Sequence, residues 1–82
     1  MEIGKSYYIE TPTKFWCGKI VDIVAGFLLL ENASWIADTG RFADFMKHGV
    51  PNEVEPVGKW KLNMVYVSGY EEYPGELPTE QK

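Results

Sequence analysis

Residues 14–31 read KFWCGKIVDIVAGFLLLE, and this stretch decides the fold. Apolar residues occupy both alternating faces of residues 14–24, a pattern typical of a β-strand with neither face fully exposed. Gly18 lies at the middle of this strand, where a residue without a side chain permits the sharp bend that a small closed sheet needs. Ala25 and Gly26 then turn the chain into a second apolar strand, residues 27–31. The stretch predicts a curved β-hairpin.

Further strand signals lie on both sides of the hairpin. Residues 6–11 are rich in aromatic and β-branched residues, and a turn at Pro12 and Thr13 separates them from the hairpin. After the hairpin we expect three more strands: a short one around Trp35, an edge strand over residues 53–55 that ends at Pro56, and a last strand over residues 60–67.

Residues 41–48 are the only helix candidate. Phe42, Phe45 and Met46 form an apolar stripe, and Gly49 ends the segment. A two-turn helix is unstable alone, so the stripe must pack on the sheet or on another subunit. The fold class we predict is mainly β (α+β): a small curved sheet or barrel of about five strands with one short helix.

The chain has 82 residues, enough for one small domain. We expect a compact β-rich domain over residues 1–70. An acidic tail containing proline and glycine, residues 71–82, follows and is either disordered or pinned by Tyr73 and Leu77. Cys17 and His48 are the only cysteine and histidine, which excludes an internal disulfide and a His/Cys zinc site within one chain. Self-association remains as the means of stabilising so small a core, and we expect a homo-oligomer.

Net charge and composition limit the classes of partner that the protein is expected to bind. The formal net charge is −4, so no global positive field attracts nucleic acid or an anionic membrane. No secretory leader or membrane-spanning run is evident, and a cytoplasmic location is expected. Aromatic residues make up 15% of the chain, more than a core this small can bury. Surplus rings of this kind usually cover an interface or a ligand.

The candidate ligand-binding site is a polar turn that no core requires. Asp38 offers a carboxylate, Thr39 a hydroxyl and Gly40 a flexible backbone. Arg41 adds a planar donor fork between the rings of two flanking aromatic residues, Trp35 and Phe42. This set can hold an anion or a flat ring. A plainer interpretation stays open, in which Asp38 or Thr39 caps the following helix and Trp35 belongs to the core.

Enzymatic chemistry has little support. Cys17 shares a strand face with Phe15 and Val21, where a thiol is buried and inert. His48 suits the end of a helix, whose dipole favours a cation. No glycine-rich phosphate loop or metal-binding pattern is present. We therefore expect a protein that is not an enzyme and that has no cofactor and no metal.

Residues 8–33 resemble the first half of an Sm-like or SH3-like small barrel. The shared pattern is a strand, a tight turn, a long strand with a central glycine, a second tight turn, and an apolar strand that here ends in Leu-Glu-Asn-Ala, residues 30–33. Sm-like proteins form rings, so the resemblance implies a barrel and ring assembly. Their helix usually precedes the first strand, whereas the helix expected here follows the third.

A second resemblance is more specific. A group of small uncharacterised proteins of tailed phages and prophages carries a Leu-x-x-Ala-x-Trp-x-Ala-Asp-Thr-Gly-Arg-Phe motif followed by Asn-Glu-x-Glu-Pro. The matching residues here are Leu30, Ala33, Trp35, Ala37 to Phe42, Asn52, Glu53, Glu55 and Pro56. The similarity spans roughly residues 2–57, with a weaker echo at Leu77 and Pro78. Those relatives continue with a glycine-rich strand containing an arginine, which this chain lacks at residues 67–70, so no role of that arginine is carried over.

The resemblance implies a function. The group is similar in size and context to compact oligomeric phage proteins that act as sponges for nucleotide signals of host immunity. It implies a counter-defence protein of the host bacterial cytoplasm, with a small nucleotide-derived ligand held at subunit interfaces. The alternative is a non-enzymatic structural or protein-interaction module, such as a minor virion component or an inhibitor of a host protein. The acidic tail and the surplus tyrosines suit this alternative.

Overall fold

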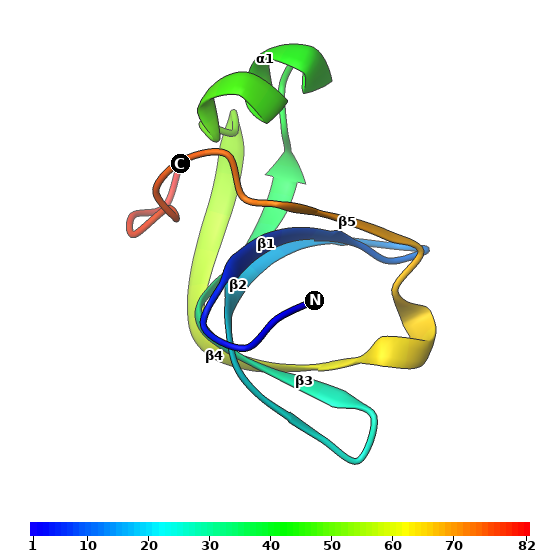
Figure 1. Cartoon of the computed structure of the whole chain (residues 1–82). Helices are drawn as coiled ribbons and strands as arrows, with labels where there is room; N and C mark the ends of the chain where they lie inside the picture. Colours follow the sequence, from blue (N-terminus) through cyan, green and yellow to red (C-terminus); the bar gives the residue numbers. More distant parts are fainter.

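The computed structural model describes residues 1–82. Five strands form one antiparallel sheet in the order β4-β3-β2-β1-β5 (Figure 1). Their bounds are β1 Ser6–Glu10, β2 Phe15–Val24, β3 Phe27–Asp38, β4 Glu53–Asn63 and β5 Gly69–Glu72. The α-helix α1, Phe42–His48, connects β3 to β4, and a 3-10 helix, Met64–Tyr66, connects β4 to β5. The predicted fold class is confirmed, and so is the place of the helix after the third strand.

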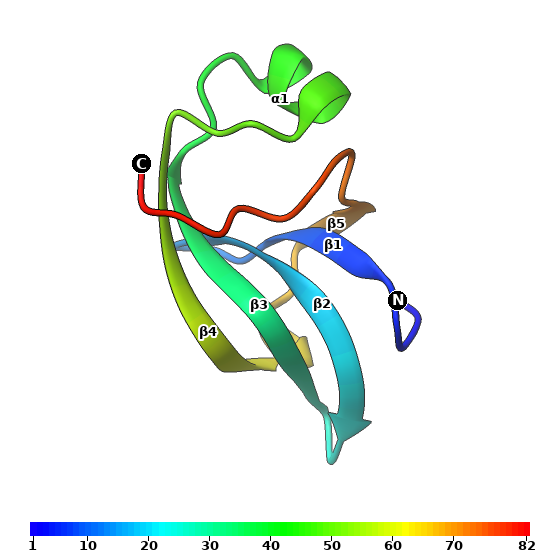
Figure 2. The same ribbon diagram turned by 90° about the vertical axis from the view of Figure 1, so that its left-hand side faces the viewer.

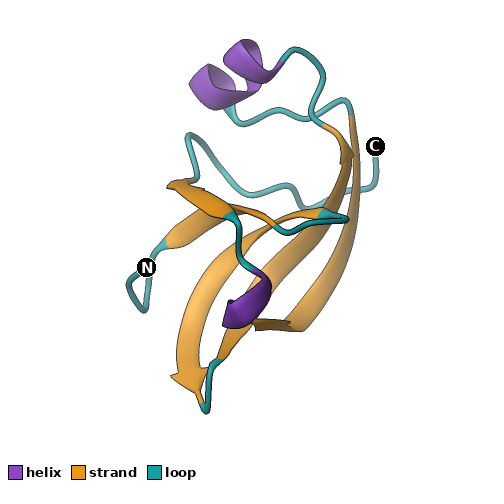
Figure 3. Cartoon of the chain, turned by 90° about the vertical axis from the view of Figure 1, so that its right-hand side faces the viewer, coloured by secondary structure: helices purple, strands orange, loops and turns teal.

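The bend of the sheet is built at Gly18. The pairing of β2 with β3 shifts register between Cys17 and Lys19 and again between Ile20 and Asp22. A Cβ atom on Gly18 would lie 3.3 Å from the Cα atom of Ala33 and 3.3 Å from the Cβ atom of Leu30. The missing side chain therefore lets β3 approach β2 closely. The long strands of the sheet are strongly curved (Figure 3).

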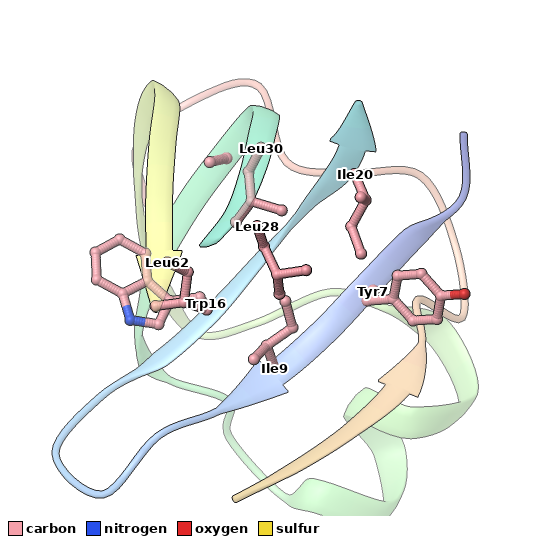
Figure 4. Packing of buried hydrophobic residues seen from close by; sticks show 8 residues of the cluster. Tyr7, Ile9, Trp16, Ile20, Leu28, Leu30 and Leu62 are labelled. Carbon is pink, nitrogen blue, oxygen red and sulfur yellow. The ribbon is translucent and has the colours of Figure 1, made fainter. Parts of the chain in front are cut away.

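The two faces of the sheet carry separate small cores. The first core fills the concave face with Tyr7, Ile9, Trp16, Ile20, Leu28, Leu30, Ala33 and Leu62 (Figure 4). The second core consists of Tyr8, Cys17, Ile36, Phe45, Val54 and Tyr73, with Met46 and Leu77 packed against it. Neighbouring residues such as Tyr7 and Tyr8 thus enter different cores, because successive side chains of a strand point to opposite faces.

Three predicted strands have other bounds in the structure than the sequence indicated. The segment around Trp35 is part of one continuous strand, β3, and Pro56 lies inside β4, which tolerates it because an edge strand needs no donor on its outer side. Residues 64–66 leave the sheet as a 3-10 turn, in which the Asn63 side chain accepts a hydrogen bond from the Val65 amide at 3.0 Å. The strand β5 that follows was not expected.

The end of the chain is ordered, and the expected boundary at residue 70 falls inside β5. Tyr73 is buried and its hydroxyl donates to the Gly49 carbonyl at 2.7 Å. Beyond it the chain runs beneath α1 to the far edge of the sheet (Figure 2), where Lys82 pairs with Val54 of β4. The structure agrees with the pinned tail rather than with the disordered one, because Leu77 packs against the second core. No helix in the chain has the length and apolar character needed to span a bilayer.

Candidate functional site

The polar turn lies between the end of β3 and the start of α1. The Asp38 carboxylate accepts a hydrogen bond from the Gly40 amide at 2.8 Å, and the Thr39 hydroxyl donates to the Gly40 carbonyl at 3.0 Å. Gly40 has a φ of 74°, and a Cβ atom there would lie 2.9 Å from the Asn52 side chain. These three residues therefore hold the shape of the turn.

Neither Asp38 nor Thr39 caps the helix, so the interpretation of these residues as a helix cap is wrong. Its N-cap residue is Arg41, which makes no side-chain cap hydrogen bond. The Asp38 carboxylate accepts a hydrogen bond from the Gly40 amide instead, and the helix begins at Phe42, after Arg41. Arg41 is exposed and forms no ion pair, since the one salt bridge of the chain joins Lys5 to Glu2 at 2.7 Å. Its guanidinium group is free to bind an anion.

The two aromatic residues of the predicted site do not meet within one chain. Trp35 is half-buried against the first core, and the Lys14 ammonium lies 5.3 Å from the centre of its ring. Phe42 is 48% exposed and packs on the second core, with its ring centre 5.8 Å from that of Tyr8. A flat ligand held by one copy therefore contacts one of these rings and not both.

Two shallow hollows open instead at the two edges of the sheet. The first lies beside β4, has a volume of about 230 Å³ and is lined by Trp35, Ala37, Glu53, Val54, Glu55, Gln81 and Lys82. The second lies beside β5, has a volume of about 280 Å³ and is lined by Tyr8, Glu10, Phe42, Gly69, Tyr70 and Glu71. Gln81 and Lys82 line the first hollow because Lys82 pairs with Val54 on the outer side of β4.

A further groove lies beside two stacked tryptophans. Trp60, which lies between two lysines in the sequence, stacks on Trp16 with ring centres 4.8 Å apart and remains 43% exposed. The groove beside this pair has a volume of about 460 Å³ and is lined by Thr11, Pro12, Thr13, Lys14, Trp16, Trp60, Leu62 and Tyr66. No acidic residue lines it. Tyr66 was missed because the sequence pattern placed it in a strand.

The reactive side chains are held apart from one another. Cys17 is fully buried, and burial raises the pKa of its thiol to about 12, so the nucleophilic thiolate is suppressed. Burial, together with a hydrogen bond to Glu10, also raises the pKa of Tyr8. His48 is exposed in the last turn of α1. No group of three or more His, Cys, Asp or Glu side chains gathers in a way that could hold a metal ion.

The chain matches no protein-family model and no curated protein. Two solved structures share its fold. A SmAP1 heptamer of P. aerophilum superposes with a TM-score of 0.63 at 20% identity, over 89% of this chain and 84% of that chain. A heptameric archaeal Sm protein superposes with a TM-score of 0.63 at 19% identity, over 88% of this chain and 90% of that one. The fold is therefore Sm-like.

Proposed function

We propose that this protein is a non-catalytic binding protein that assembles edge to edge into a homo-oligomer and holds a small nucleotide-derived ligand at its subunit interfaces. In the setting that the sequence motif implies, it is a phage counter-defence protein that sequesters an immune signal in the host cytoplasm. The proposal rests on two features of the fold, the free edges of the sheet and the position of the aromatic side chains relative to them.

Assembly is supported by the two strands that lack an outer partner. The strand β4 pairs with no strand other than β3, and β5 with none other than β1, although Lys82 is bonded to the outer side of β4 at Val54. The Met64 amide donates inward to the Gly26 carbonyl at 2.9 Å, so by alternation the Lys61 and Lys59 amides point outward. An unpaired row of donors and acceptors of this kind is a template for a strand of another chain. We propose antiparallel pairing of β4 with β5 of the next copy, and the two solved structures with this fold are heptamers.

Ligand binding at the interface is supported by one observation above all. The aromatic side chains of the predicted site are divided between hollows that open at opposite free edges, Trp35 beside β4 and Phe42 beside β5. In the proposed assembly a strand of the next copy lies along the β5 edge beside the second hollow, whereas Gln81 and Lys82 line the first hollow at the β4 edge. The half-exposed rings provide stacking surfaces for a base, and Arg41 provides an unpaired cation for a phosphate.

Mass measurement and a ligand screen test the proposal together. Light scattering at micromolar concentration should give a multiple of the 9.4 kDa chain mass. In a thermal-shift screen of cyclic oligonucleotides and nicotinamide-derived signals, a bound compound should raise the melting temperature, because ligand binding to the folded state alone stabilises it. A sharp monomer mass contradicts the assembly and every interface site with it.

A second candidate function is a protein-interaction module, either a minor virion component or an inhibitor of a host protein. Val65 and Tyr66 on the 3-10 helix are 83% and 60% exposed, and Tyr66 lines the same groove as the half-exposed Trp60. Exposed apolar and aromatic side chains that gather in this way mark protein-binding surfaces. An oligomer that no compound of the screen stabilises would favour this second function.

A further inference from the structure

The last nine residues, 74–82, form an arm that joins the two edges of the sheet. The arm begins after β5 at one edge and ends against β4 at the other (Figure 2). Two hydrogen bonds fix its end: the Val54 amide donates to the Lys82 carbonyl at 2.8 Å, and the Lys82 amide donates to the Val54 carbonyl at 2.9 Å. This reciprocal pair is antiparallel strand pairing, so the start of β4 is an acceptor site for an extended segment.

Pro56 separates this acceptor site from the remainder of the β4 edge. Val54 pairs outward, and Pro56, two residues later, occupies the next outward position without an amide hydrogen to donate. The outward amides of Lys59 and Lys61 lie beyond it. The edge thus offers two places for strand addition, a short one at Val54 and a longer one after Gly58.

The acceptor site contacts the arm through its backbone and through apolar side chains. Glu53, Glu55 and Lys82 line the same hollow, and no ion pair joins them. Leu77 of the arm packs against the second core, to which Val54 belongs. Every copy of the chain carries the same acceptor and the same arm.

We propose that the arm exchanges between copies, so that in the oligomer residues 74–82 of one subunit occupy the Val54 site of its neighbour. This inference rests on the antiparallel pairing of β4 with the next copy's β5 proposed above. That pairing directs the chain leaving β5 along β4 toward Val54, because antiparallel strands run in opposite directions. Nine extended residues reach roughly 30 Å, whereas Gly58 and Val54 are about 13 Å apart along a strand.

Engineered disulfides distinguish the two positions of the arm. Pairing of Lys82 with Val54 places Gln81 directly opposite Glu55, a position without ladder hydrogen bonds where Cα atoms lie about 4.5 Å apart. This distance permits a disulfide. The single variants Glu55→Cys and Gln81→Cys are mixed in equal amounts, unfolded and refolded together, and oxidised. Buried Cys17, whose thiol ionises only at high pH, stays reduced.

Exchange predicts a covalent dimer containing one copy of each variant on a non-reducing gel, at a yield well above that of either variant oxidised alone. The double variant Glu55→Cys/Gln81→Cys should form a ladder of linked chains. Suppose that light scattering shows an oligomer, that the mixture gives no mixed dimer, and that the double variant forms its disulfide only within one chain. This result overturns the exchange of the arm and leaves the proposed assembly standing. A monomeric mixture overturns both. A Lys82→Pro variant, which loses the bonding amide, should give less mixed dimer than Lys82→Ala, which keeps it.

Discussion

At the scale of single residues, small features of the backbone decide what the polar side chains can do. Gly40 sits in a left-handed conformation against Asn52, and the turn around it engages Asp38 and Thr39. Arg41, the next residue, has no ion-pair partner although it stands at a helix N-terminus, where a positive charge is slightly unfavourable. Arg41 is therefore the residue at which the proposed anion site can be tested.

Arg41→Ala should therefore abolish binding of the phosphate-bearing compound that performs best in the screen. The free energy of unfolding should stay within about 1 kcal/mol of the parent value, as is usual for exposed side chains. Calorimetric titration measures the affinity, and Lys47→Ala, which removes an exposed cation from the last turn of the same helix, is the matched control. Unchanged affinity in Arg41→Ala would exclude the turn from the site.

Cys17 should make the protein less stable in alkaline solution. Its pKa rises from 9.0 in the unfolded chain to about 12 in the folded protein because the thiol is buried. The folded state thus retains a proton that the unfolded state releases, so the stabilisation is complete below pH 9 and declines as the pH rises from 9 toward 12. Urea denaturation between pH 8 and 10 should show this decline, and Cys17→Ala should flatten it. An equal slope in both proteins would assign the effect to other groups.

At the scale of elements, α1 is held by one deeply inserted ring. Phe45 is 1% exposed and lies edge-on to Tyr8 and Tyr73, with ring centres 5.3 and 5.8 Å away. Phe42, one turn earlier, remains half-exposed although the sequence placed both in one apolar stripe. Gly49 ends the helix in a left-handed conformation, and its carbonyl accepts the Tyr73 hydroxyl. The helix and the segment after β5 therefore stabilise each other.

Alanine substitutions at Phe45 and Phe42 should distinguish the buried ring that anchors the helix from the half-exposed one. Phe45→Ala should lower the free energy of unfolding by about 3 to 5 kcal/mol, since it leaves a cavity in the second core. Phe42→Ala should cost about 1 kcal/mol. Equilibrium unfolding in urea measures both. Equal losses would mean that Phe42 is buried in solution, as it would be if another subunit covers it.

At the scale of the whole molecule, the five-stranded sheet leaves two edges open, and the edge of β4 carries lysines and a proline. Such residues discourage indiscriminate strand pairing. Pairing at one defined stretch after Gly58 and capping of Val54 by the arm would let copies join in a single register. Under the proposed function, the division of the candidate site between the two edges would give the assembly a binding role that one chain lacks.

Lys61→Pro should reduce the assembled mass measured by light scattering, because proline removes an amide that points out of the sheet. Lys61→Ala, which removes the same charge but keeps the amide, should assemble like the parent. Circular dichroism of both variants checks that the fold persists. If both assemble fully, the contact between copies does not use this stretch of β4.

The sequence by itself determined the bent hairpin, the mainly β class and the short helix after the third strand. These depend on local properties: alternation of apolar side chains, a glycine at a bend, and glycines at turns. For the tail it left two alternatives, a disordered segment or one pinned by Tyr73 and Leu77. Only the tertiary structure decided which face each ring covers, because two register shifts along β2 and β3 change how side chains match across strands. Trp35 and Phe42 lie against different cores because Trp35 points to the first core from β3, whereas the helix that carries Phe42 packs on the second. The partners of β5 and Lys82 are distant residues that no local pattern specifies.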